Sequence, residues 1–127
     1  MTYNSRKPKN PFAKMTIELV SLDTDRFDSE ELIEILKEIR FDLININLSI
    51  SKESVGIKGR GFAPIGFVNK FYTNEEGHYV FDVAISSRYA ETIEEMKESS
   101  DIGITARVFT NRGNITKIIG LDLISYQ

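Results

Sequence analysis

The sequence predicts one mainly β domain with two helices, an α+β fold. Apolar and polar residues alternate in several short runs, such as YVFDVAIS at 79–86, which is the period of a half-buried strand. Two other runs repeat apolar residues every three or four positions, which is the period of an amphipathic helix. A chain of 127 residues is long enough to bury one core of its own.

The first half of the chain predicts a basic arm followed by a β-α-β unit. Residues 1–14 carry two prolines, four cations and no acid, which is typical of a flexible arm. Residues 15–127 are expected to form the domain, with an extension at 15–50: a strand at 15–23, a helix at 28–39 and a strand at 41–54. Asp28 and Glu31 have capping-box spacing at the start of that helix.

The second half, 55–127, predicts further strands, a second helix and a hairpin. A glycine-rich turn leads into a strand at 65–74, where Pro64 indicates an edge, a bulge or a strand start because proline cannot donate a ladder hydrogen bond. The turn NEEG precedes a strand at 78–86, and a short amphipathic helix at 89–99 follows with Ile93 and Met96 inward. The turn NRGN predicts a hairpin between strands at 102–111 and 114–125.

Composition removes several classes of function. The chain has no cysteine, so disulfides and cysteine-bound metals are excluded and a reducing, cytoplasmic location is expected. The single histidine, His78, has no histidine partner for a catalytic or zinc centre. No apolar run is long enough for a membrane span, and no apolar stretch follows the basic N-terminus as in a secretory signal.

Charge is unevenly distributed along this acidic chain of formal net charge -3. Nine acids fall within 18–42, and five more fall within 91–101, so both acidic blocks coincide with the predicted helices. The strands are then mildly basic, and a segregated basic surface binds polyanions even when the total charge is negative. Charged helices are also simply what a solvated helix face looks like.

The run VGIKGRGFAPIGFVNKFY at 55–72 combines glycine, cation and aromatic residues without matching a phosphate-binding motif. Pro64 stands where a dinucleotide fingerprint needs its third glycine, and no Gly-Lys-Ser/Thr of a P-loop is present. We interpret the run as a bent strand or a place where the backbone approaches a ligand. No nucleophile, base or carboxylate pair has the context of a catalytic site, so neither an enzyme nor a cofactor is expected.

Aromatic residues beside cations indicate binding of single-stranded nucleic acid, in which bases stack on rings and cations neutralise phosphates. Arg107 and Phe109 are expected on the face opposite Ile104, Ala106 and Val108. Gly66, Val68, Lys70 and Tyr72 are expected to share one face of their strand, and which face is exposed is left open. Against this, each of Phe62, Phe67, Phe71 and Phe81 is more often a core residue than a stacking platform.

The stretch YVFDVAISSRYAETIEEMKESSDIGITARVFTNRGNITKIIGLDLI, about a third of the chain, resembles the C-terminal half of OB-fold single-stranded DNA-binding proteins. The likeness lies in Phe81-Asp82-Val83 leading to a helix that opens with Ala90-Glu91, and in Ala106-Arg107-Val108 standing where the family has Gly-Arg-Leu. It implies a five-stranded OB-type barrel with a helix between its third and fourth strands. The lack of tryptophan and of an acidic tail is similar to divergent members carried by conjugative plasmids or phages.

The resemblance and the residue patterns together predict sequence-tolerant single-stranded DNA binding, in DNA transfer or replication of a mobile element. RNA is the other ligand that such a surface accepts. The N-terminal arm is expected to link copies of the chain into a homo-oligomer through Tyr3 and Phe12. The alternative is a non-catalytic, OB-like adaptor that binds a protein partner through its acidic helices. The predicted nucleic-acid-binding residues are Lys58, Arg60, Phe62, Lys70, Tyr72, Arg88, Tyr89, Arg107, Phe109, Arg112 and Lys117.

Overall fold

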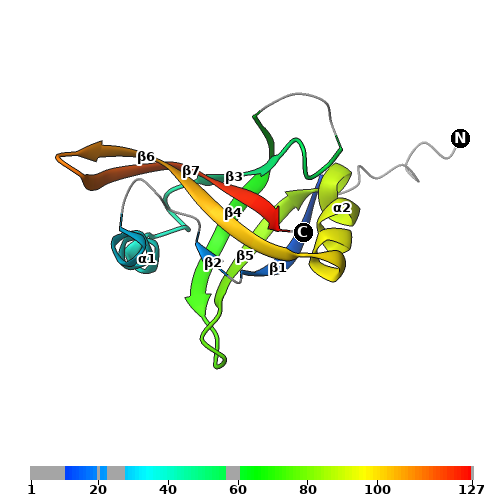
Figure 1. The fold of residues 1–127 in the computed structure, drawn as a ribbon, viewed down its shortest axis with the longest axis horizontal. Helices are drawn as coiled ribbons and strands as arrows, with labels where there is room; N and C mark the ends of the chain where they lie inside the picture. Colours follow the sequence, from blue (N-terminus) through cyan, green and yellow to red (C-terminus); the bar gives the residue numbers. More distant parts are fainter. Residues whose placement is uncertain (1–10, 20, 23–27, 57–60, 127) are drawn as a thin grey trace, which may run out of the picture.

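The computed structural model describes residues 11–19, 21–22, 28–56 and 61–126. It confirms a mainly β fold with two helices (Figure 1). The elements in chain order are β1 (Phe12–Leu19), β2 (Ser21–Leu22), α1 (Ser29–Glu38), β3 (Ile46–Ser51), β4 (Phe62–Thr73), β5 (Tyr79–Ser86), α2 (Ser87–Ser99), β6 (Asp101–Asn111) and β7 (Asn114–Tyr126).

All of these strands belong to one sheet with the order β1-β5-β4-β3-β7-β6-β2. The predicted five-stranded barrel is therefore wrong in strand number, because six long strands and the two-residue β2 are present, and no pairing among the described strands closes the order into a ring. β2 and most of β1 come from the range 15–50 that we treated as an extension, whereas Phe12, Ala13 and Lys14 at the start of β1 come from the range 1–14 that we expected to be a flexible arm. β1 pairs with β5 at one end of the order, and β2 pairs with β6 at the other.

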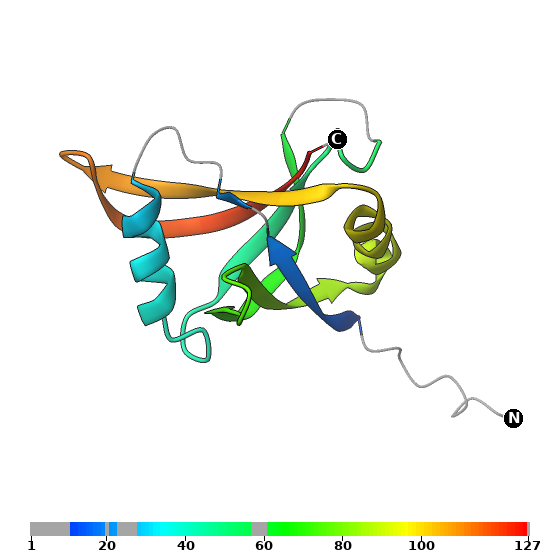
Figure 2. The same cartoon turned by 60° about the horizontal axis from the view of Figure 1, so that its bottom comes forward.

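The third strand, β3, lies in the middle of the sheet. It pairs antiparallel with β4 on one side and parallel with β7 on the other. The two helices lie at opposite ends of the molecule, with α1 beneath the far end of the β6–β7 hairpin and α2 beside β1 and β5 (Figures 1 and 2). No helix in the described ranges is long and apolar enough to cross a membrane.

The sheet buries one side of each strand in the core and turns the other side outward, which we call the outer face. In β1, for example, Ile17 and Leu19 are fully buried while Thr16 and Glu18 are exposed. The core is continuous across the sheet and reaches both helices, through Leu32 and Leu36 of α1 and through Ile93 and Met96 of α2, as predicted for α2.

The helix α1 begins at the predicted cap, but the second half of the capping box is used elsewhere. The Asp28 carboxylate accepts a hydrogen bond from the Glu30 backbone N–H at 3.0 Å. Glu31 does not reach back to the cap; its carboxylate accepts from the backbone N–H of Ile115 at 2.7 Å, far away on β7. This bond ties α1 to the β6–β7 hairpin next to a register shift between Phe109 and Thr110.

The strand predicted at 41–54 is shorter than expected. Residues 41–44 form a turn, in which the Arg40 carbonyl accepts hydrogen bonds from the N–H groups of Leu43 and Ile44 at 2.9 and 2.8 Å. The Arg40 guanidinium also pairs with Asp42 at 2.8 Å, which stabilises the turn. The apolar–polar alternation continued through the turn, so the pattern alone did not mark where β3 begins.

Two irregularities in β4 decide which of its side chains face outward. The register with β3 shifts between Leu48 and Ser49 next to Pro64, so of the edge, bulge or strand start that Pro64 indicated, the structure shows a bulge. The register with β5 shifts between Val68 and Lys70, so Val68 is buried whereas Lys70 is exposed. The prediction that Val68, Lys70 and Tyr72 share one face is therefore wrong, because the extra residue at this shift reverses the alternation.

Both predicted hairpin turns are confirmed. In the first, the Asn74 side-chain oxygen accepts hydrogen bonds from the N–H groups of Glu76 and His78, each at 3.0 Å. In the second, Arg112 and Gly113 have φ of 54° and 84° between β6 and β7. These are the left-handed conformations that tight hairpin turns require.

Replacing Glu31 with alanine tests the link between α1 and the hairpin. We expect Glu31→Ala to lower the free energy of unfolding by about 1–3 kcal/mol, because the partly buried Ile115 N–H loses its charged acceptor. Glu34→Ala, at an exposed position of the same helix, should change it by less than about 0.5 kcal/mol. Urea denaturation measures both, and equal effects of the two variants would contradict the assignment.

Candidate nucleic-acid interface

One row of residues crosses the outer face from β1 to β6. The strand registers place Lys14 opposite Ala84, Ala84 opposite Phe67, Phe67 opposite Asn47, Asn47 opposite Gly120 and Gly120 opposite Arg107. We call this set the cross-strand row. It has an exposed cation at each end, a half-buried aromatic ring and an exposed amide near its middle, and small residues between them.

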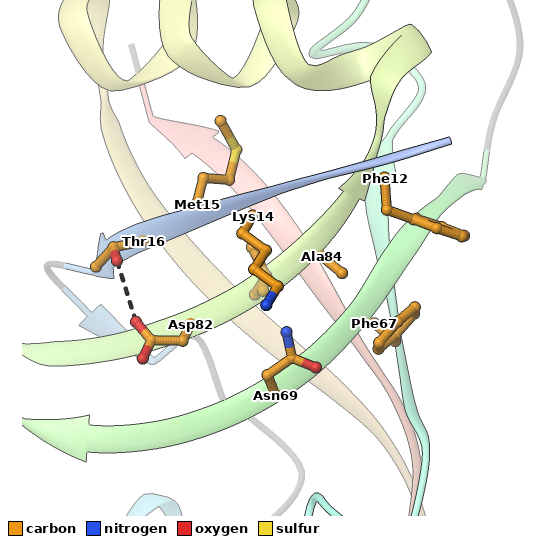
Figure 3. Close-up of a pocket in the computed structure, with 9 residues that line it drawn as sticks. Phe12, Lys14, Met15, Thr16, Phe67, Asn69, Asp82 and Ala84 are labelled. Atoms are coloured by element: carbon orange, nitrogen blue, oxygen red, sulfur yellow. Dashed lines mark hydrogen bonds between the residues drawn. The ribbon is translucent and has the colours of Figure 1, made fainter. Parts of the chain in front are cut away.

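A depression of about 680 Å³ covers the β1 end of the row. Figure 3 shows the rings of Phe12 and Phe67 side by side, with the Lys14 and Asn69 side chains pointing toward one another, while Met15 turns to the other side toward α2. The two rings meet edge to face with centroids 5.4 Å apart. The Thr16 hydroxyl donates to Asp82 at 3.0 Å, at the end of the depression away from the two rings (Figure 3). Phe12, which we expected to dock on another subunit, therefore packs on a ring of its own chain.

The β6 end of the row holds an arginine that is fixed in place. Arg107 Nε donates to Asp122 Oδ2 at 3.1 Å, and its Nη2 lies 3.4 Å from Ser49 Oγ. Gly120 makes the room for this arrangement, because a Cβ there would lie 2.6 Å from Nη2 and 3.3 Å from Cζ. The Asp122 side chain is 1% exposed, whereas the Arg107 side chain is 49% exposed.

Asp122 is an acidic residue whose side chain is almost fully buried. Its Oδ1 is buried without a hydrogen-bond partner among the described groups. Burial raises the pKa of the Asp122 carboxyl above its ordinary value, because a charged carboxylate is poorly solvated there, and the Arg107 guanidinium offsets part of that rise. Most buried polar atoms have a hydrogen-bond partner, as Asp122 Oδ2 has in Arg107.

The far half of the β6–β7 hairpin brings three predicted residues together. Phe109 is 57% exposed and pairs across the hairpin with the exposed Lys117, while Arg112 lies in the turn. The confirmed alternation puts Phe109 on the same face of β6 as Arg107. Ile119, at the register shift on β7, adds a 41% exposed apolar side chain.

Other predicted residues lie in separate groups. The Lys70 ammonium is 5.0 Å from the centre of the half-buried Tyr72 ring on β4, and the Arg88 guanidinium is 5.7 Å from that of Tyr89 on α2. Phe62, at the start of β4, is 40% exposed. Tyr3, Lys58 and Arg60 lie outside the described residues.

The phenylalanines divide between core and surface. Phe71 and Phe81 are buried, at 7% and 1% exposure, and pack on each other with centroids 4.8 Å apart. Phe67 instead belongs to the outer face, which the sequence left open because both faces of its strand carry aromatic residues. Lys14 and Asn47 were also missed as site residues, although Phe12, Lys14 and Thr16 do alternate with Ala13, Met15 and Ile17.

The helices are acidic, as the sequence indicated, but the described strands are balanced in charge rather than mildly basic. They carry the cations Lys14, Lys70, Arg107 and Lys117 and the acids Glu18, Asp82, Asp101 and Asp122. The cations Lys14, Lys70 and Lys117 are exposed on the strands, and none of them forms an ion pair with another residue in the described ranges. The acids of the two helices are mostly exposed: Glu30, Glu34, Glu38, Glu91, Glu94, Glu95 and Glu98. The acids nearest the row, Asp82 and Asp122, are bound to Thr16 and Arg107.

His78 has partners that the sequence did not predict. Its Nδ1 pairs with the Glu18 carboxylate and lies 3.7 Å from Glu76 Oε2. The three side chains bring possible metal-ligand atoms within 4.8 Å of one another. All three are accessible to solvent, and the pairing of His78 with Glu18 accounts for their arrangement, so we assign no metal to them.

The raised pKa of Asp122 predicts how stability depends on pH. A folded-state pKa above the unfolded value means that the contribution of this carboxyl to stability is fully present below pH 3.8 and is lost as pH rises through the folded pKa. The free energy of unfolding of the wild type minus that of Asp122→Asn, which cannot titrate, should therefore fall from about pH 3.5 to pH 7. Urea denaturation across this range measures it, and a difference that rises with pH would contradict the assignment.

Comparison with known proteins supplies no relative for this fold or this site. The chain matches no protein-family model, no curated protein and no solved structure.

Proposed function

We propose that this chain is a non-catalytic, sequence-tolerant single-stranded DNA-binding protein whose ligand crosses the outer face of the sheet. The observation that carries the proposal is the cross-strand row, in which Lys14 and Arg107 stand at the two ends of a line through Phe67. Six strands contribute to it, so it spans five strand-to-strand steps, or roughly 24 Å. A few nucleotides fit along that length.

The chemistry of this face suits single strands better than duplexes. The Phe67 ring is half-buried, with Ala84 and Asn47 opposite it on the two neighbouring strands and the Phe12 ring edge to face with it. An unpaired base can turn its π-face to such a ring, whereas the bases of a duplex are already stacked on one another. The phosphates of the strand are then neutralised by the exposed side chains of Lys14, Lys70 and Lys117.

The order of elements supports kinship with the OB family. From β3 to β7 the chain runs strand, strand, strand, helix, strand, strand, which is the order of that family with a helix between its third and fourth strands. The additional strand β1 and the lack of tryptophan favour a divergent member of the mobile-element type. We further propose that the arm before β1 links copies of the chain into an oligomer.

One feature favours a second candidate, an adaptor for a basic protein partner. The outward side of α2 presents Glu91, Glu94, Glu95 and Glu98 to solvent, balanced there only by Lys97 and Arg88. A basic partner would bind this helix and leave the outer face free. The two candidates therefore use different surfaces and respond to different substitutions.

Fluorescence anisotropy with labelled single- and double-stranded oligonucleotides across a salt series tests the proposal. We expect the single strand to bind more tightly than the duplex, and its affinity to fall steeply as salt rises because counterions are released. An RNA strand measured in the same salt series shows whether the protein prefers RNA or DNA. Absence of single-strand binding at low salt would overturn the proposal and leave the adaptor.

Substitutions on the outer face should separate stacking from charge. Phe109→Ala combined with Tyr72→Ala should weaken binding by about 30-fold or more, since each of the two stacked bases contributes about 1–3 kcal/mol. Lys117→Gln should lower the magnitude of the salt slope by about 0.7, as for one lost phosphate contact on a single strand. Lys37→Gln, an exposed cation on α1, is the matched control and should change neither quantity. Equal effects at Lys37 and Lys117 would place the ligand elsewhere.

A further inference from the structure

Arg107 differs from the other cations of the outer face, and the difference bears on its role in the binding that we propose above. Its charge is already paired with the buried Asp122 carboxylate, so the two together carry little net charge toward a phosphate. Lys14 and Lys117, in contrast, have no carboxylate partner among the described residues.

The position of the guanidinium is fixed from three sides. Asp122 accepts from Nε, Ser49 lies at hydrogen-bond distance from Nη2, and the group lies across the outward side of Gly120, where any larger residue would displace it. One side of the group thus rests on the sheet. With 49% of the side chain exposed, the other side is open to solvent on the outer face.

From this geometry we propose that Arg107 is a base-stacking platform rather than a phosphate anchor, and that Asp122 and Gly120 are its positioning residues. Guanidinium groups stack on aromatic planes, including nucleobases, and a group held in place loses little freedom when a base settles on it. Arg107 and Phe67 then provide two flat surfaces along the row, with the exposed Asn47 between them. The inference rests on the proposed function and assigns the chemistry of one of its residues.

Two substitutions remove the platform and keep the positive charge. Arg107→Lys retains an ion pair with Asp122 but has no planar group. Gly120→Ala leaves Arg107 in the chain and pushes its guanidinium aside; the added methyl otherwise makes only an ordinary contact, 3.4 Å from the Asn47 carbonyl oxygen. Because the displaced group is the far end of a flexible side chain, this variant should fold, and thermal unfolding checks both variants.

The experiment compares a short oligodeoxythymidine with an abasic strand of the same length at low salt. We expect both variants to bind the oligodeoxythymidine about tenfold more weakly than the wild type, with an unchanged salt slope, and to bind the abasic strand as the wild type does. Lys117→Gln is the matched control for a phosphate contact. It should weaken binding to both strands and lower the magnitude of the salt slope by about 0.7.

Two results would overturn the inference while leaving the proposed function intact. Either Arg107→Lys and Gly120→Ala bind oligodeoxythymidine like the wild type, or they lose as much affinity for the abasic strand as for the strand with bases. If the wild type binds neither strand, the proposed function fails and this inference fails with it.

Discussion

The parallel pairing of β3 with β7 is the contact on which the rest of this structure depends. β3 joins the β1-β5-β4 side of the sheet to the β7-β6-β2 side, and Leu48 and Ile50 lie opposite Leu121 and Leu123 in its register. All four side chains are buried, so a slip by one residue would turn them outward. The same register places Asn47 beside Gly120 and Ser49 beside Asp122, which means that core packing also assembles the outer face.

The inner and outer faces of the sheet contribute differently to the stability of the fold. The inner face is apolar almost throughout and contributes the stability of the fold. The outer face holds the costly groups, above all the buried carboxylate of Asp122 with one oxygen unpartnered. The Arg107 guanidinium offsets part of this cost through its hydrogen bond to Asp122 Oδ2 at 3.1 Å.

Much of the fold could be predicted from local sequence, because it depends on local physics. Strand alternation located β5, β6 and β7, helical spacing located both helices, and Asn74 and Gly113 marked their turns. The register shift between Val68 and Lys70 could not be predicted, since an added residue leaves no trace in composition, and this is why Val68 and Lys70 were expected on one face. Non-local pairing was equally invisible: nothing near Glu31 indicates that it accepts from Ile115.

For the candidate site, sequence identified types of residue better than their arrangement. It singled out Arg107 and Phe109 because they alternate with apolar neighbours on a regular strand. It could not find Asp122 or Gly120, whose importance arises only when β7 lies between β3 and β6. The expected barrel failed for a related reason, since β1 pairs with β5 and β3 pairs with β7, and both partners are distant in the chain.

The central claim is that the outer face, and not the helices, binds single-stranded nucleic acid. Titrating the isotopically labelled protein with oligodeoxythymidine and following each backbone amide by NMR tests it most directly. We expect the shift changes to concentrate on the cross-strand row and the β6–β7 hairpin, at residues such as Lys14, Phe67, Asn47 and Phe109. Changes confined to α1 and α2, with the amides of the row unmoved, would contradict it.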